Sequence, residues 1–332
     1  MNDSQPTARP TDRAWENLCA QVTHFAADEA NRDQVAQLLA GLLRPYCHPP
    51  LYQKYFRFWE QHGFHLTPVH FYQPVPDTRT LPDSLWKKAS AMRGIDLNEA
   101  TQLQLLRESF PKFRDEYSRF PRAATGEPHE FYLDNGRFSG TDALVLYCMV
   151  RHLQPRRVIE VGSGFSSLIT AQAARRNGNT ELVCIEPYPE ELLQKGFPGL
   201  TQLLPQKVEE IAPEYFEELQ ANDILFIDSS HVVKIGGDVN YLFFEILPRL
   251  KPGVVVHVHD IFLPNEYRRD WVMDEFRFWT EQYLLQAFLM FNSDWEVLFA
   301  NSFMAQKHLA EFQATFPDSP WWGGGSFWMR RK

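Results

Sequence analysis

The sequence predicts an α/β protein in which a parallel sheet carries helices on both of its faces. Three observations favour this fold class. Beyond about residue 135, short apolar segments alternate with segments of helical periodicity. The segment 223–228 is uninterruptedly apolar between its two aspartates, and a glycine-containing turn follows the apolar segment 157–161. Alternation of this kind joins neighbouring parallel strands through helical crossovers.

The expected elements follow one another in a regular order. Strands are expected at 157–161, 181–186, 201–204, 223–228, 254–259, 295–300 and 326–330. Helices are expected at 165–176, 208–219, 239–250 and 271–290. The dipeptide Asn177-Gly178 and the tripeptide Lys251-Pro-Gly253 have the composition of helix ends. Together these elements predict one sheet domain at 135–332.

The first 134 residues have another pattern, in which prolines interrupt helical periodicity. Helices are expected at 15–43, 51–61 and 97–110. We predict a disordered tail at 1–13 and a mainly helical cap region at 14–134.

The segment 65–77 of that region contains three prolines and is expected to be an extended loop. Two interpretations are open for its aromatic and imidazole side chains. They either face a cleft as part of a lid or pack on the sheet. The side chains concerned are His65, His70, Phe71 and Tyr72.

Composition excludes several classes of function. Of 332 residues, 44% are hydrophobic and 23% are charged, which is typical of globular proteins. The net charge of −9 disfavours nucleic acid as a partner, because attraction to phosphates needs positive charge. No segment approaches the roughly 20 apolar residues that cross a bilayer, so no membrane partner is expected. Residues 1–13 lack the apolar core of a secretion signal.

The cysteines indicate the compartment. Cys19, Cys47, Cys148 and Cys184 are widely spaced and form no CxxC pair, which is typical of reduced thiols. We therefore expect a cytoplasmic protein that acts on a small-molecule partner, in an oligomeric state that the sequence leaves open.

A nucleotide site is predicted where the strand at 157–161 ends. Ligands of such sheets bind beyond the carboxyl ends of the strands. Gly162 and Gly164 allow the backbone to approach a ligand, and the following helix start offers free N–H groups to an anion. Glu186 stands 22 residues beyond Gly164, after the second strand, where an acid accepts hydrogen bonds from both ribose hydroxyls.

Two features of this segment disfavour a nicotinamide dinucleotide. Ser167 stands where the dinucleotide fingerprint has a third glycine or alanine. Glu160, before the first glycine, suits a cationic ligand. These features disfavour a nicotinamide-dependent oxidoreductase, which stays open as one alternative. A second alternative is a non-catalytic interaction protein that keeps the nucleotide fold.

The segment from Val158 to Ser167, VIEVGSGFSS, resembles the first motif of class I S-adenosylmethionine-dependent methyltransferases. The resemblance implies a Rossmann-like seven-stranded sheet and S-adenosylmethionine as cofactor. It implies that Glu186 holds the ribose and that Asp228 and Ser229 lie beside the cofactor. The loop around the methionine end of the cofactor would consist of Glu160, Gly162, Ser163, Gly164, Ser166 and Ser167.

Polar clusters also follow the fourth and fifth strands, Asp228-Ser-Ser-His231 and His257-Val-His259-Asp260. They resemble the Asp-Gly-Asp-His and His-Asp segments of bacterial small-molecule O-methyltransferases, and the likeness extends to 71–77 and 325–328. It implies methyl transfer to an oxygen of a small acceptor, with acceptor nitrogen as an open alternative. Ser229 and Ser230 replace the glycine and the acid of the family, which argues against a multi-carboxylate magnesium site.

Two mechanisms are open for these clusters. In the first, His231 is a general base and Lys234 holds an anionic acceptor. In the second, a divalent metal lowers the pKa of the acceptor. The metal ligands would be Asp228, His231, His259 and Asp260, a donor set that favours iron, manganese or zinc over magnesium. His259 is a catalytic candidate in either case, whereas His257 is expected to be structural because it lies nearer the middle of its strand.

Overall fold

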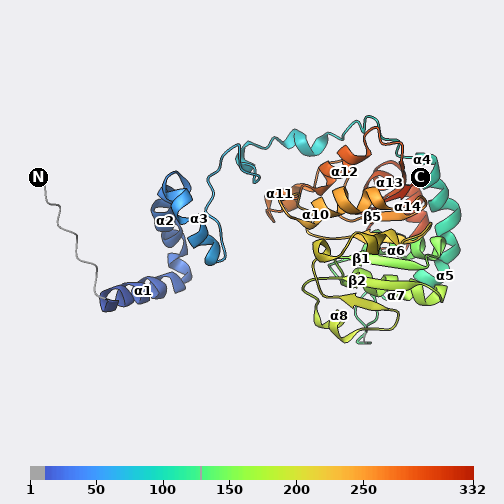
Figure 1. The fold of residues 1–332 in the computed structure, drawn as a ribbon, viewed down its shortest axis with the longest axis horizontal. Coiled ribbons are helices and arrows are strands. Elements are labelled where there is room, and N and C mark those ends of the chain that lie inside the picture. The colour runs from blue at the N-terminus through green and yellow to red at the C-terminus, as the bar shows by residue number, and fades with distance from the viewer. Residues whose placement is uncertain (1–11, 128) are drawn as a thin grey trace, which may run out of the picture. The chain divides into compact units, whose positions relative to one another are not determined.

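The structure, a computed structural model, describes residues 12–127 and 129–332 (Figure 1). The chain divides into two units, Met1–Arg79 and Thr80–Lys332. The division therefore lies at Arg79 rather than at the expected boundary between 134 and 135. The reason is packing, because Leu106, Phe110 and Phe131 are fully buried in the same hydrophobic core as the sheet.

The first unit consists of helices and a long loop. Its helices are α1 (Asp12–Ala27), α2 (Arg32–Leu43) and α3 (Leu51–Gln61), with 3-10 turns at Glu29–Asn31 and Arg44–Cys47. The single helix expected at 15–43 is interrupted at Asp28, whose carboxylate accepts a hydrogen bond from the Ala30 N–H and caps the next turn. No helix or strand covers 62–77, as the prolines predict.

Residues 1–11 of the predicted tail lie outside the described residues, and α1 already includes Asp12 and Arg13. All described side chains of α1, α2 and α3 retain contact with solvent, with no fully buried residue among them. The first unit thus has no buried core of its own within its described residues.

The second unit begins with short helical segments that precede the sheet. They are a 3-10 turn at Asp83–Lys87, α4 (Glu99–Gln104), a π-helical turn at Leu105–Ser109, a 3-10 turn at Phe110–Phe113 and α5 (Arg114–Tyr117). The helix α6 (Gly140–Leu153) follows, which the sequence pattern did not predict. It is apolar on nearly every side and almost wholly buried, so it lacks the amphipathic periodicity that marks a surface helix.

The sheet has seven strands, as expected. They are β1 (Arg157–Val161), β2 (Glu181–Ile185), β3 (Gln202–Leu204), β4 (Ile224–Ile227), β5 (Val255–Val258), β6 (Trp295–Ala300) and β7 (Phe327–Arg331). Their order is β3-β2-β1-β4-β5-β7-β6. One strand departs from the expected parallel arrangement: β7 lies between β5 and β6 and is antiparallel to both.

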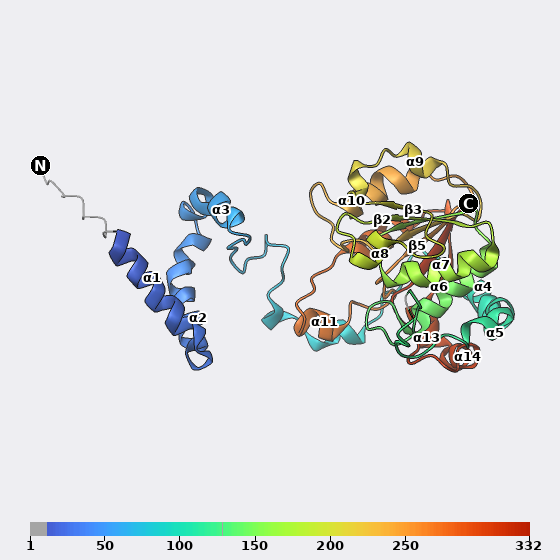
Figure 2. The ribbon, with the colours of Figure 1, turned by 90° about the horizontal axis from the view of Figure 1, so that it is seen from below.

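Helices cover both faces of the sheet, which confirms the predicted fold class. In Figure 2, α6 and α7 (Phe165–Asn177) lie on one side, and α9 (Glu214–Glu217) and α10 (Asp238–Tyr241) lie on the other. The remaining helices are α8 (Glu191–Lys195), α11 (Arg269–Met273), α12 (Glu281–Leu289), α13 (Asn301–Lys307) and α14 (Leu309–Thr315).

Two further expected helices, both in the second unit, are interrupted. Pro213 separates a 3-10 turn at Val208–Glu210 from α9, and the helix expected at 271–290 is divided into α11 and α12 by the loop 274–280. None of the helices in the described ranges is long and apolar enough to span a membrane. All four cysteines are free.

Candidate functional site

Strand order reverses between β1 and β4, and the carboxyl ends of these two strands lie against each other. Gly162, directly after β1, has a φ of 77°. A Cβ atom added there would lie 1.7 Å from the carbonyl oxygen of Asp228. The close approach of the two strand ends therefore requires glycine at this position. This is the switch point at which ligands of open α/β sheets bind.

Glu160 is fully buried beneath the start of α7. Its Oε1 accepts hydrogen bonds from the hydroxyls of Ser166 (2.6 Å) and Ser167 (2.7 Å), whereas Oε2 has no partner. Burial raises the pKa of Glu160 to about 8, although the two hydroxyls oppose the shift. Glu160 holds the loop to the helix and lines neither cavity at the strand ends, so this geometry does not present it to a cationic ligand.

Glu186 stands at the mouth of the same edge, directly after β2. Its Oε2 accepts a hydrogen bond from the Ser163 N–H (3.3 Å) and its Oε1 from the Tyr188 N–H (2.9 Å). These two contacts join the loop after β1 to the loop after β2. The carboxylate remains partly exposed and lines both cavities described next.

Two cavities, of about 420 Å³ and about 200 Å³, share Gly162, Glu186 and Asp228 as lining residues. Tyr188 and Lys207 also line the larger cavity. Predicted site residues that line at least one cavity are Gly162, Ser163, Gly164, Ser166, Glu186, Asp228, Ser229 and Lys234. Glu160 and Ser167 lie behind them.

Lys234 lines the larger cavity on the exposed loop before α10. The cavity also includes Asp238, whose carboxylate accepts hydrogen bonds from the Ser230 N–H (2.8 Å) and the Ser230 hydroxyl (2.5 Å). Asp238 was not predicted as a site residue. It fixes the loop after β4, which also carries Lys234.

The strand ends of β4 and β5 carry what we call the acid-histidine cluster, Asp228, His231, His259 and Asp260. Asp228 Oδ1 lies 3.2 Å from His231 Nε2 and 3.4 Å from His259 Nδ1. Asp260 lies 3.5 Å from each of these nitrogen atoms. The four side chains that were expected at one edge of the sheet are therefore adjacent.

His231 is held between carboxylates. Its Nδ1 lies 2.9 Å from Oε2 of Glu281, which is fully buried, and its Nε2 faces Asp228. Although burial disfavours the charged ring, the hydrogen bonds to Asp228 and Glu281 raise the pKa of His231 to about 10. The ring is consequently protonated at neutral pH and has no free lone pair with which to accept a proton.

The backbone around His231 is clamped to the start of α12. The carbonyl oxygen of His231 accepts hydrogen bonds from the N–H groups of Thr280 (2.9 Å) and Glu281 (3.1 Å), and the Thr280 hydroxyl accepts one from the Val233 N–H (2.8 Å). His231 itself has a φ of 59°, a left-handed conformation that is unfavourable for a residue with a Cβ atom. The clamp offsets this strain and fixes the direction of the ring.

His259 makes different contacts. Both ring nitrogens are buried without a hydrogen-bond partner. The Nε2 atom lies 3.7 Å from Oδ2 of Asp142, on the opposite side of the ring from Asp228 and Asp260. Burial opposes the charge of the ring, but Asp260 and Asp228 raise the pKa of His259 well above its usual value. The ligand atoms of Asp228, His259 and Asp260 all lie within 4.8 Å of one another, a grouping that does not include His231.

Sequence reasoning missed Asp142 and Glu281. Asp142 lies on the unpredicted helix α6, and its carboxylate accepts hydrogen bonds from Asn301 (2.8 Å), the Ser326 N–H (2.9 Å) and the Gly325 N–H (3.1 Å). Glu281 lies 50 residues after His231, inside what was expected to be one continuous helix. The one sequence signal that could have identified either residue is an acid within an otherwise apolar helical segment.

His257 stands apart from the chemistry. Its ring is fully buried, stacks on Phe226 with centroids 4.1 Å apart, and has no hydrogen-bond partner on either nitrogen. Burial lowers the pKa of His257 well below its usual value, which keeps the ring neutral. Its position in the core is that of a structural residue.

Comparison with known proteins adds the family. An uncharacterised protein of Archaeoglobus fulgidus is 32% identical over 166 residues, which cover 47% of this chain and 75% of that protein. The chain belongs to the same family as this archaeal protein. Residues 159–261, from within β1 to the residue after Asp260, match the family model described as a methyltransferase domain. The match includes the glycine turn, Glu186 and the acid-histidine cluster.

Several solved structures are similar. The O-methyltransferase TomG from Streptomyces achromogenes, in complex with S-adenosylmethionine, is 16% identical, with 71% of this chain and 91% of that chain covered and a TM-score of 0.36. The O-methyltransferase from Bacillus cereus, in complex with S-adenosylhomocysteine, is 16% identical, with 60% and 84% covered and a TM-score of 0.36. A CmcI structure with magnesium and S-adenosylmethionine is 15% identical, with 66% and 84% covered and a TM-score of 0.33. At this level of likeness they carry no argument about function.

Proposed function

We propose that the protein is an S-adenosylmethionine-dependent methyltransferase that transfers a methyl group to an oxygen of a small-molecule acceptor. The observation that carries the proposal is the pair of cavities at the switch point, which share Gly162, Glu186 and Asp228 within the segment that matches a methyltransferase domain. Such a pair suits a cofactor with a nucleoside at one end and an amino acid at the other.

The residues present fit that cofactor. A Cβ atom added at Gly164 meets no other atom within 4 Å, so the smaller cavity leaves room at the backbone. The Ser229 hydroxyl, at the larger cavity, is buried without a hydrogen-bond partner. In this assignment Glu186 holds the ribose, and Ser163, Gly164 and Ser166 surround the amino-acid end.

When bound, the cofactor supplies a methyl group activated by a sulfonium: the S–CH₃ bond breaks and the sulfur keeps its electron pair, while an O–CH₃ bond forms and the acceptor releases its proton. The protein then has to position the acceptor and exclude water. The acid-histidine cluster, which includes Asp228, lies at the same edge of the sheet. It is therefore the part of the chain assigned to acceptor activation.

Geometry favours the metal alternative for that activation. The first alternative made His231 the general base, but both of its nitrogens are engaged by carboxylates, Nδ1 by Glu281 and Nε2 by Asp228. The Nδ1 atom of His259 has no hydrogen-bond partner and lies next to Asp228 and Asp260, an arrangement that fits a divalent metal. Asp228, His259 and Asp260 would hold the ion, which would lower the pKa of an acceptor hydroxyl. A nitrogen-and-oxygen donor set of this kind suits manganese, iron or zinc.

Calorimetric titration of the metal-stripped chain with S-adenosylmethionine tests the cofactor. We expect saturable binding that Glu186→Ala weakens by at least about tenfold, because a charge-assisted hydrogen bond of this kind contributes roughly 1.5–3 kcal/mol. The matched control is Glu191→Ala, which removes an exposed carboxylate from α8. Binding of NAD in place of S-adenosylmethionine, or of neither, would refute the proposal.

The metal is tested separately, by titration of the same chain with Mn²⁺, Fe²⁺, Zn²⁺ and Mg²⁺. We expect Mn²⁺ to bind and Asp260→Asn to abolish its binding, whereas the control Asp270→Asn, at an exposed ion pair with Arg268, leaves it unchanged. Equal metal binding by both variants would leave acceptor activation to the protein's own side chains.

A further inference from the structure

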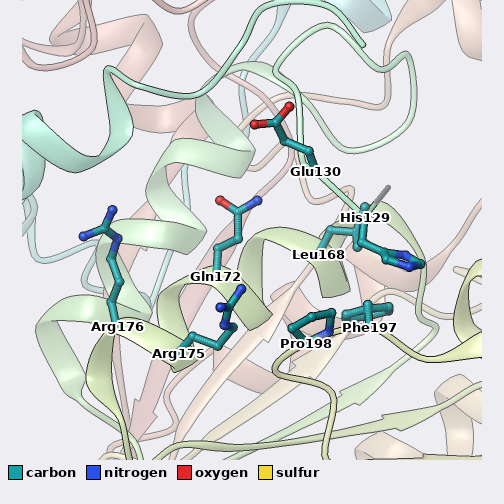
Figure 3. Close-up of a pocket in the computed structure, with 8 residues that line it drawn as sticks. All are labelled: His129, Glu130, Leu168, Gln172, Arg175, Arg176, Phe197 and Pro198. Atoms are coloured by element: carbon teal, nitrogen blue, oxygen red, sulfur yellow. The ribbon is translucent and has the colours of Figure 1, made fainter. Parts of the chain in front are cut away.

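A separate cavity of about 530 Å³ lies along α7 (Figure 3). It shares no lining residue with the two cavities at the strand ends. Helix α7 supplies Leu168, Gln172 and Arg175, which recur at helical spacing on one face of the helix. The loop after α8 supplies Phe197 and Pro198.

One wall of this cavity is apolar and firmly placed. Leu168 and Phe197 are 3% and 8% exposed, so they are anchored in the core. At Gly199 the loop lies so close to α7 that an added Cβ atom would be 2.8 Å from the Ala171 carbonyl oxygen. The loop is therefore held on the helix, and the apolar wall is part of the fold.

The other wall is cationic. Within the described ranges, no carboxylate lies within 4.0 Å of the guanidinium of Arg175, which is an exposed side chain. Arg176 reaches Glu116 only at 3.8 Å, and that carboxylate already binds Arg151 at 2.8 Å. The dipole of α7 favours cations in its last turn, but it does not account for an apolar wall beside them.

The loop before α6 closes the cavity with one acid and one imidazole. Glu130 is the one carboxylate of the lining, and the Thr125 hydroxyl donates a hydrogen bond to it. His129 has a buried Nδ1 atom without a hydrogen-bond partner, and its ring lies 6.2 Å from that of Phe197. In Figure 3 the side chains of Gln172 and Arg175 extend from α7 on the side where this loop passes. The two arginines outweigh the single acid.

We propose that this cavity is a second ligand site, for a small organic anion. Its carboxylate or phosphate group would pair with Arg175, and its apolar part would pack on Leu168 and Phe197. A guanidinium binds either anion through two parallel hydrogen bonds, so the two chemistries share one site. The site is independent of the cofactor cavities and goes beyond methyl transfer.

Calorimetric titration of the full chain with phenyl phosphate, benzoate and inorganic phosphate tests this site. We expect phenyl phosphate or benzoate to bind saturably and at least about tenfold more tightly than inorganic phosphate, because only the first two also bury a ring. Whichever of the two binds more tightly identifies the anionic group. Repeating the titration with S-adenosylmethionine present should leave the affinity unchanged.

Charge variants give effects of opposite sign. Arg175→Ala should weaken binding of the tighter aromatic anion by at least about tenfold, since it removes a charge-assisted pair. Glu130→Gln should strengthen it about twofold, because it removes a like charge. The matched control Arg119→Ala, at an exposed arginine outside the cavity, should change nothing.

Three results would overturn the proposal. The first is that neither aromatic anion binds saturably at concentrations up to about 10 mM. This limit is well above 1 mM, the dissociation constant of a weak site with a binding free energy of about −4 kcal/mol. The second is equal binding by the wild-type chain and Arg175→Ala. The third is displacement of the probe by S-adenosylmethionine, which would locate the probe in the cofactor cavities.

Discussion

The two sides of the cleft are built in different ways. On the side of β1 and β2, a contiguous segment from Glu160 to Ser167 makes its own turn, and Glu186 adds two hydrogen bonds to neighbouring N–H groups. Its order comes mostly from short-range contacts, such as those of Ser166 and Ser167 with Glu160.

The acid-histidine side is assembled from distant parts of the chain. His231 depends on Glu281, 50 residues away, and His259 lies beside Asp142, which comes from α6. Two of its residues, His231 and Asp260, adopt left-handed backbone conformations. The comparison teaches that local sequence suffices for a backbone turn, whereas a buried cluster of charges needs partners from other elements.

The largest effect on stability is expected at Gly162, where the backbones of two strand ends are in close contact. Gly162→Ala should destabilise the fold by more than about 3 kcal/mol, because its Cβ atom would collide with the Asp228 carbonyl and strain a left-handed residue. The control is Gly164→Ala, whose φ of 180° and open surroundings accommodate a Cβ atom, with an expected change below about 1 kcal/mol. Urea unfolding measures both. Equal losses would show that the close approach of β1 and β4 is not what requires glycine.

The clamp on His231 should give the next largest effect. Glu281→Gln removes one partner of a buried ion pair and should cost about 2–4 kcal/mol of unfolding free energy. Glu275→Gln breaks an exposed pair with Arg277 and should change stability by less than about 1 kcal/mol. Urea unfolding of the two variants compares them directly. A loss as small for Glu281 as for Glu275 would mean that the cluster does not depend on its distant partner.

The stability of the fold should depend on pH through Glu160, the buried acid on the side of β1 and β2. Because the pKa of Glu160 is about 8 in the folded chain and near 4.5 when unfolded, the folded state retains a proton that the unfolded state loses. This acid should therefore lower stability as pH rises from 4.5 to 8, with a slope of at most about 1.4 kcal/mol per pH unit.

Unfolding at pH 5, 6.5 and 8 measures that slope. Glu160→Gln cannot ionise, so the difference between wild type and variant isolates Glu160 from other titrating groups. We expect the stability of the variant relative to wild type to rise with pH. A difference that stays constant would mean that Glu160 is ionised in the folded chain, as the interpretation of it as the partner of a cation requires.

The smallest effect concerns Ser229. Its hydroxyl is buried without a partner, so Ser229→Ala should leave stability within about 0.5 kcal/mol of wild type or raise it slightly. Affinity for S-adenosylmethionine should nevertheless fall about fivefold if the hydroxyl makes a hydrogen bond to the cofactor, since the family resemblance implies that Ser229 lies beside it. Unchanged affinity in the same titration would remove Ser229 from the cofactor site.

Much of the fold followed from the sequence alone. The spans of β1, β6 and α3 were predicted residue for residue, and the other strands to within one or two residues. The glycine turn was also recognisable, because its backbone approaches a ligand at a fixed spacing along the sequence. Apolar runs of strand length and glycine before a helix are local properties that survive in any context.

Tertiary structure alone decided the rest. It made β7 antiparallel and placed residues 80–134 in the same unit as the sheet. It also buried α6 on nearly every side, so the sequence of α6 has no amphipathic periodicity from which a helix could be predicted. It also engaged both nitrogens of His231 with carboxylates, which sequence could not show because Asp228 and Glu281 meet it only after the chain has folded. The residue types were present in the sequence, but the protonation of a buried side chain depends on its neighbours in space.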